Sequence, residues 1–208
     1  MDVGAKQKIL NAARQVFAEK GYDGASVSEI AKAAGVNKAL PFYYFESKEN
    51  LLREIVKQST AENMERQEIF FRYADPTARE TIEEYYDHLM DALEGKRETV
   101  KILLSESLKS TDGHPILFDF LAPVLEGVKA KLDRLGYKVA DPQRLATTEL
   151  FFDAIPLFMH AVLSEKWAAY SSIPESKVNE DFQHAFKQIY VEYLFQLYFS
   201  KVKKEVDF

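Results

Sequence analysis

The sequence predicts an all-α protein with a small N-terminal helical domain and a larger helical body. Three observations support this class. Apolar residues recur at the three- and four-residue spacing of amphipathic helices along most of the chain. No segment shows the strict alternation that is typical of a β-strand. Prolines, glycines and small polar residues stand where such helices should begin and end, and 208 residues are enough for one or two domains with hydrophobic cores.

The first helix is expected at residues 5–20, and Gly21 follows at the position of a C-terminal cap. Its apolar stripe consists of Ile9, Ala12, Ala13, Val16 and Phe17. We expect this stripe to pack across the next two helices and to complete a three-helix head.

Two short helices joined by a sharp turn are expected next. Ser26 and Glu29 have the spacing of a capping box, in which each side chain binds a backbone N–H that the helix start leaves unpaired. Gly35 permits a turn that a Cβ atom would resist. Asn37 can cap the second short helix, and Ser47 can cap the long helix that follows. This is the helix-turn-helix pattern, whose second helix can lie in a DNA major groove.

These residues resemble the DNA-binding domain of the TetR family of transcriptional repressors. The shared features are a capped helix, an Ala-Gly-Val turn, an aromatic-rich helix that ends in Tyr44-Phe45, and the segments 21–27 and 47–52 on either side. The rest of the chain matches that family only in length and helical character. The resemblance implies a DNA-binding domain at residues 3–63, with its helix-turn-helix motif at 26–45, and a ligand-binding and dimerisation domain at 64–208.

The resemblance also implies which residues contact DNA. Base edges are the expected partners of Lys38, Ala39, Leu40 and Tyr43. Phosphates are the expected partners of Tyr44 and Lys48, and Ser26 is expected near a phosphate at its own helix start. Lys48 supports this implication, because a cation at a helix N-terminus is mildly unfavourable unless an anion docks there.

Pro41 departs from the family pattern, in which an aliphatic residue is common at this position. If Asn37 caps the helix, Pro41 is its fourth residue and removes the first internal hydrogen bond. If Lys38 caps it, Pro41 falls in the first turn, where proline is tolerated. We expect a shifted or tightened helix start. The aromatic residues Phe42 and Phe45 are expected in the core of the head.

The helical pattern continues beyond Glu54 to about Tyr73 without a flexible linker, so a stiff helix is expected to connect head and body. Further helices are expected at residues 76–94, 97–109, 115–135, 142–170 and 175–204. The last helix carries apolar residues on two sides, which predicts burial on two sides.

We expect the last two helices to pair with those of a second copy in a four-helix interface, an arrangement that the family resemblance also implies. The residues assigned to this dimerisation surface are Leu150, Leu157, Val191, Phe195 and Phe199. The alternative is a larger monomeric core.

A ligand pocket is expected among the helices of the body. Its candidate lining residues are Phe70, Tyr85, Leu89, Leu104, Phe118, Phe151, Phe152, Ile155, Phe158 and Met159. Such an aromatic-rich set suits a flat or long apolar effector, and plain core packing is the alternative reading of each residue. The acidic residues Glu84, Glu106, Glu149 and Asp153 would favour a cationic ligand, but most are expected to be solvated.

Charge is divided unevenly along the chain. Residues 1–57 hold nine Lys/Arg against seven Asp/Glu, a net charge of +2, and the remainder holds 18 against 26, a net charge of −8. A basic head on an acidic body suits a protein that touches phosphates at one end only. No secretory signal or membrane span is apparent, and the absence of cysteine fits a reducing cytoplasm.

Other chemistry is sparse in the sequence. No phosphate-binding glycine loop, nucleophile elbow or metal-ligating histidine spacing is present, so no catalytic residue, metal or cofactor is expected. The leading hypothesis is a cytoplasmic DNA-binding repressor, dimeric on a near-palindromic operator and released by a small-molecule ligand. The alternatives are a helical small-molecule-binding protein that no longer binds DNA, with Pro41 as its main support, and an enzyme on a helical scaffold.

Overall fold

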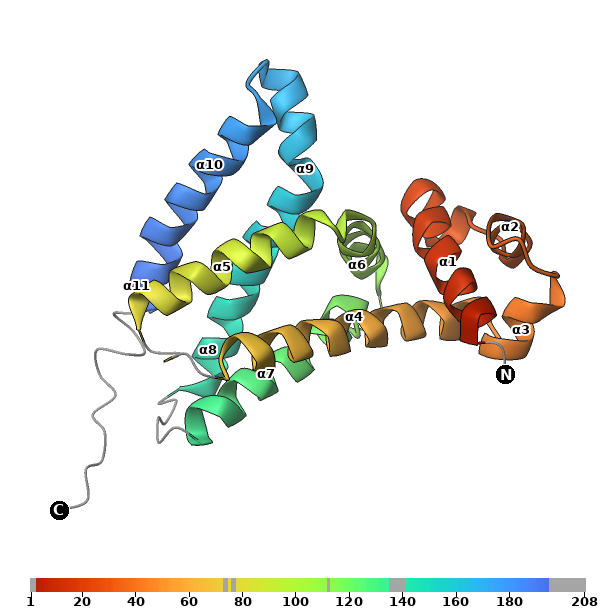
Figure 1. The fold of residues 1–208 in the computed structure, drawn as a ribbon, viewed down its shortest axis with the longest axis horizontal. Helices are drawn as coiled ribbons and strands as arrows, with labels where there is room; N and C mark the ends of the chain where they lie inside the picture. The colour runs from red at the N-terminus through yellow and green to blue at the C-terminus, as the bar shows by residue number, and fades with distance from the viewer. Residues whose placement is uncertain (1–2, 73–74, 76–77, 112, 135–140, 195–208) are drawn as a thin grey trace. The chain divides into compact units, whose positions relative to one another are not determined.

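The computed structural model describes residues 3–72, 75, 78–111, 113–134 and 141–194, and the regular structure of these residues is entirely helical (Figure 1). The predicted all-α class is confirmed. In chain order the elements are α1 (Val3–Gly24), α2 (Val27–Ala33), α3 (Ala39–Phe45), α4 (Lys48–Phe70), α5 (Arg79–Glu94), α6 (Arg97–Lys109), α7 (Ile116–Arg134), α8 (Pro142–Thr148), η1 (Glu149–Ala154), α9 (Ile155–Ser171), α10 (Glu175–Phe186), η2 (Lys187–Val191) and α11 (Glu192–Leu194).

The chain folds into two compact units. Unit 1 comprises Met1–Asn63 and Lys96–Leu121, and unit 2 comprises Met64–Gly95 and Ala122–Phe208. The sequence placed residues 96–121 in the second domain, whereas their contacts lie in unit 1. The reason is packing: Ile102 of α6 is buried in the same hydrophobic cluster as the apolar stripe of α1. The division at residues 63 and 64 otherwise stays a prediction.

Local sequence signals account for the breaks between the helices of unit 1. Helical geometry stops at Gly21, whose φ of 74° and ψ of 164° suit glycine and strain other residues. Gly35 likewise takes a φ of 66° between α2 and α3. The predicted cap at Ser47 is confirmed, since its Oγ accepts a hydrogen bond from the Asn50 backbone N at 3.0 Å.

The start of α3 is tightened, as Pro41 led us to expect. The Asn37 carbonyl accepts from the backbone N of Leu40 at 2.9 Å, only three residues on, and the Asn37 side chain accepts from the backbone N of Ala39 at 2.9 Å. Because Lys38 is the residue that precedes the helix, Pro41 falls in the first turn, where its missing N–H has no required partner. Pro41 itself is fully buried.

Unit 2 is built around the helical run Pro142–Ser171, which packs against α5 and pairs with α10 in a hairpin (Figure 1). By length and composition alone this run is apolar enough to cross a membrane, but one side of it lies in the core of unit 2. Its segment η1 has the wider turn of a π-helix and ends two residues before Pro156, which has no N–H to donate. The predicted helix at 175–204 is interrupted by η2, and its residues 195–204 lie outside the described residues.

Candidate functional site

The start of α2 is fixed by the predicted capping box, which the structure confirms. The backbone N of Glu29 donates to Ser26 Oγ at 3.2 Å, and the backbone N of Ser26 donates to Glu29 Oε2 at 2.9 Å. Lys20 also donates to the Glu29 carboxylate. The hydrogen bond from Lys20, followed by those from Ser26, lowers the pKa of Glu29 to about 2. The box is therefore ionised at neutral pH, and Ser26 stays exposed at the head of α2.

The helix α3 presents aromatic side chains to solvent. Tyr43 is 68% exposed and Phe42 is 53% exposed, so the prediction that Phe42 lies in the core is wrong. Pro41 and Phe45, four residues apart, occupy the inward side of this short helix, and 100° steps turn Phe42 away from them. The burial of Phe45 is confirmed. The four-residue spacing of Pro41 and Phe45 places both on one side of the helix, and this spacing is the sequence signal that indicates an exposed Phe42.

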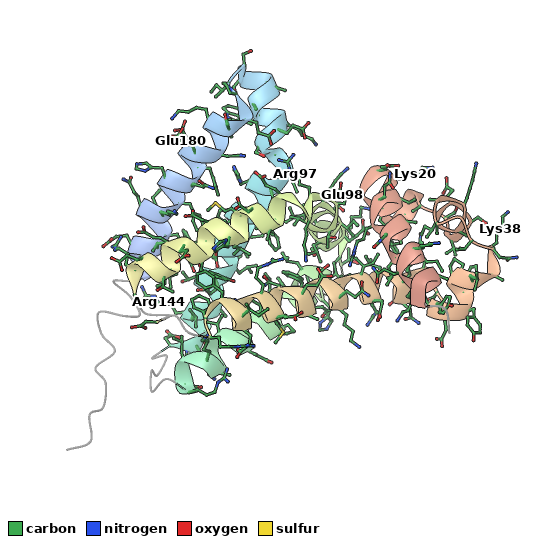
Figure 2. The ribbon with its side chains drawn as sticks, in the orientation of Figure 1. Lys20, Lys38, Arg97, Glu98, Arg144 and Glu180 are labelled. Carbon is green, nitrogen blue, oxygen red and sulfur yellow. The ribbon has the colours of Figure 1, made fainter. Side chains whose placement is uncertain are left out.

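The other predicted DNA-contacting residues divide into exposed and half-buried positions. Lys38 and Ala39 are exposed, and Figure 2 shows Lys38 on the outer side of the turn before α3. Leu40 and Tyr44 are half-buried and pack against the core of unit 1. Residues 30–45 contain two lysines and no acidic residue. The exposed side of α3 is thus aromatic, with positive charge at its start.

Lys48 begins α4, but its ammonium is engaged within unit 1. Its Nζ donates to the carbonyls of Tyr22 at 2.8 Å and Ala25 at 3.1 Å, and lies 4.3 Å from the centroid of the Tyr22 ring. An ammonium carries three N–H groups, so one remains after these two bonds. Lys48 therefore ties the connection between α1 and α2 to α4, whatever it binds outside the protein.

The predicted pocket residues do not all lie in one unit. Phe70 and Tyr85 meet in unit 2, with ring centroids 5.5 Å apart, and Tyr85 and Phe158 are buried. Leu104 and Phe118 belong instead to unit 1. Four of the predicted residues are exposed in the single chain: Phe118, Phe151, Phe152 and Met159. Two others, Leu89 and Ile155, are half-buried.

Unit 2 contains a half-buried carboxyl pair, whereas most of the four acidic residues singled out in the body were expected to be solvated. Glu149 and Asp153 lie one turn apart on η1. Glu149 Oε1 accepts from the Tyr190 hydroxyl at 2.8 Å, and Asp153 Oδ2 accepts from the Tyr86 hydroxyl at 3.1 Å. Burial raises the pKa of both carboxyls, and the neighbouring Glu149 raises the pKa of Asp153 further, to well above its usual range. Periodicity gave no sign of this pair, because its partners lie on α5 and η2.

Because of the raised pKa values of this carboxyl pair, we expect the free energy of unfolding to fall as the pH rises. Both carboxyls have a higher pKa in the folded chain than the ordinary value of about 4 in the unfolded chain, so their contribution is fully present below about pH 4. It is lost as the pH rises through their raised folded values, where the pair must ionise. Thermal unfolding followed by circular dichroism between pH 4 and pH 9 measures the effect.

Replacing Asp153 by asparagine should flatten this pH profile, since an amide keeps the shape of the acid without titrating. The control is Glu84→Gln, which removes an exposed carboxylate of α5 and should leave the profile of the wild-type chain. Equal slopes for wild type and Asp153→Asn would show that the pair ionises freely.

Two of the predicted dimerisation residues are buried in the single chain. Leu157 is 2% exposed and Val191 is 0% exposed, because both pack into the core of unit 2. Leu150 is half-buried, and Phe195 and Phe199 lie outside the described residues. The apolar side chains that these helices leave in solvent include Met159, Leu163 and Trp167 on α9, Ile189 on η2 and Tyr193 on α11.

Comparison with known proteins assigns the N-terminal segment. Residues 9–55 match the family model of bacterial regulatory proteins, tetR family. The negative transcriptional regulator IcaR of the biofilm operon icaADBC, from Staphylococcus aureus (strain Newman), is 42% identical over 52 residues, which are 25% of this chain and 28% of IcaR. The probable HTH-type transcriptional regulator YttP of Bacillus subtilis (strain 168) is 45% identical over 58 residues, or 28% of each chain. These matches thus span little more than a quarter of either curated relative.

Most of the chain resembles a solved structure in its fold. The transcriptional regulator FadR from Bacillus subtilis, in complex with stearoyl-CoA, matches 89% of this chain and 97% of its own with a TM-score of 0.65 and 22% identity, a likeness of fold. The capped α2, the glycine turn and the exposed α3 all lie inside the matched residues, so the N-terminal segment of this chain is a helix-turn-helix domain of the TetR type.

Proposed function

We propose that the protein is a DNA-binding transcriptional repressor that binds a near-palindromic operator as a homodimer and is released by a small-molecule effector. The observation that carries the proposal is the exposed side of α3, which holds Lys38, Ala39, Phe42 and Tyr43 within a segment free of acidic residues. The regulator works in the cytoplasm, where bacterial chromosomes lie, and family members of this kind are not enzymes.

The exposed residues at the start and along the outer side of α3 contact the DNA bases. Lys38 donates to guanine edges, whereas Tyr43 and Phe42 make apolar contact with thymine methyl groups in the major groove. Leu40 is half-buried and reaches bases less fully than Ala39. The remaining roles are contacts with phosphates, made by Tyr44, by the third N–H of Lys48 and by the exposed Ser26.

Dimerisation sets the distance between the α3 helices of the two copies, which we call the reading helices. Met159, Leu163 and Trp167 of α9 are exposed and spaced four residues apart, as are Ile189 of η2 and Tyr193 of α11, and a second copy can cover this apolar surface symmetrically. Leu150, which is half-buried, stays a candidate for this surface, as do Phe195 and Phe199, which lie outside the described residues. Two reading helices then lie about 34–36 Å apart on one side of the DNA, which requires a near-palindromic operator.

The effector binds in unit 2, whose interior is rich in aromatic rings. Phe70, Phe71 and Tyr85 form a group of rings that is connected through Tyr86 to Phe186 and Tyr190. An apolar or aromatic molecule is the class of ligand that suits such a lining. Stearoyl-CoA, the ligand of the FadR structure, belongs in the panel of probes. The effector acts by binding more tightly to an arrangement that does not fit the operator.

The alternative of a small-molecule-binding protein without DNA-binding activity depended on Pro41. The short turn at Asn37 accommodates this proline and leaves α3 intact, so no observation favours that alternative. A gel shift with DNA that flanks the protein's own gene separates the two readings, since only a repressor retards this DNA more than an unrelated duplex of equal length.

Lys38→Ala tests the role of α3. Loss of a base contact should weaken operator binding by about 1–3 kcal/mol and relax the preference at one base pair of each half-site. The measurement is fluorescence anisotropy with the operator and with single-base variants of it. Lys57→Ala removes the same charge from an exposed position of α4 and should bind like wild type. Equal binding by the two variants would exclude Lys38 from the interface.

A further inference from the structure

Three lysines bind residues 18–25, where the regular helix of α1 breaks at Gly21 and the chain leads into α2, and we call Lys48, Lys101 and Lys109 the lysine clasp. Lys48 binds the carbonyls of Tyr22 and Ala25, as described above. Lys101 Nζ donates to the carbonyl of Ala18 in the last regular turn of α1. Lys109 Nζ lies 3.2 Å from Asp23 Oδ2 and 2.8 Å from Glu106 Oε1.

The position of Lys109 is supported by a second observation. A Cβ atom added to Gly21 would lie 3.9 Å from Lys109 Nζ, so this ammonium sits beside the residue at which the regular helix of α1 breaks. The last carbonyls of a helix carry partial negative charge, and lysine side chains interact favourably with them. Two lysines of α6 are therefore placed on the C-terminal end of α1 in agreement with its electrostatics.

The connection that the clasp holds determines where the helix-turn-helix segment begins. It leads from Gly21 through Ala25, which is buried, to Ser26, the cap of α2. From there α2 and α3 follow within twenty residues. A shift of this connection moves the start of α2, and α3 moves with it because Ile30 and Phe45 share one core cluster.

We propose that Lys101 and Lys109 of α6 are positioning residues for operator binding, which hold the start of α2 in the arrangement that fits DNA without touching the DNA themselves. This inference rests on the proposed function. The side chain of Lys109 is about half exposed, and ion pairs of such residues contribute little to overall stability. Their effect is on the placement of α2 and α3.

The test uses the full chain with both lysines replaced, Lys101→Met with Lys109→Met. Operator affinity should fall by about 2- to 30-fold, the range that is typical of mutations that act on a distant site. The slope of log affinity against log salt should stay at the wild-type value, since no phosphate contact is lost. The double variant Lys101→Arg with Lys109→Arg, which keeps donors and charge, should restore binding. Lys129→Met, at an exposed lysine of α7, controls for one lost charge.

Amide hydrogen exchange measures, without DNA, how firmly the lysine clasp holds residues 22–33. In the double Met variant, exchange should quicken in residues 22–33 and stay unchanged in the first half of α4. Unchanged exchange in residues 22–33 would overturn the clasp even if the protein binds its operator. A salt slope reduced by about 0.9 for each lysine lost would instead show that these lysines contact phosphates. Failure of the wild-type chain to bind any operator, with exchange altered as expected, would overturn the proposed function and its operator-positioning consequence while leaving the clasp.

Discussion

Replacing Ile189 by aspartate is expected to convert the proposed dimer into monomers and to weaken operator binding by about 10²- to 10⁴-fold, the advantage that joining two binding modules confers. Ile189 lies on η2 with 70% of its side chain exposed, so the single chain tolerates a charged residue there. In a symmetric interface the substitution brings two carboxylates close to the axis, where they lose water without gaining a partner. Light scattering after gel filtration measures the oligomeric state, and fluorescence anisotropy measures operator affinity.

The matched control is Ser176→Asp in the first turn of α10, an exposed position where a negative charge suits the helix dipole. This variant should remain dimeric and bind the operator like wild type. Circular dichroism should show the same helix content for both variants. A dimeric Ile189→Asp protein with undiminished affinity would place the dimer contact on another face of unit 2.

Ile102→Ala is expected to destabilise the DNA-binding unit by about 2–5 kcal/mol, the usual cost of removing a large buried aliphatic side chain. Ile102 is 57 residues from Phe45 in the sequence, yet both are buried in the same core cluster. Total stabilities of about 5–15 kcal/mol make this loss large. Urea unfolding followed by circular dichroism measures it, and operator binding should be lost at urea concentrations that the wild-type protein tolerates.

Leu108→Ala provides the control for Ile102→Ala. It removes an apolar side chain of similar size from the same helix, but Leu108 is 87% exposed, and such surface substitutions usually change stability by less than about 0.5 kcal/mol. Equal destabilisation by the two variants would mean that α6 does not contribute to the core of unit 1.

The head of the molecule was predictable because its signals are local. The capping box at Ser26 and Glu29 and the turn at Gly35 each depend on residues within a few positions of one another, and all of them form as predicted. Even the effect of Pro41 followed from the rule that a first-turn residue needs no N–H. The misplacement of Phe42 came from assigning both phenylalanines of a short helix to the core, although only Phe45 lies on its inward side.

The rest required contacts between distant segments. Hydrophobic periodicity shows that a helix buries one side but does not identify what covers it, so Leu157 and Val191 were assigned to a second copy although their own chain buries them. In the same way, Glu149 and Asp153 appeared solvated because the tyrosines that cover them come from α5 and η2. The assignment of α6 to unit 1 likewise depends on packing across about ninety residues of chain.

The discontinuous make-up of unit 1 bears on how such regulators can be recombined. A chimaera that grafts residues 1–63 onto a foreign effector domain leaves Ile102 and its helix behind, and the transplanted portion then lacks part of its own interior. Exchange of operator preference between relatives calls for transferring residues 96–121 as well, or for swapping only the solvent-facing side chains of α3 within an otherwise untouched polypeptide.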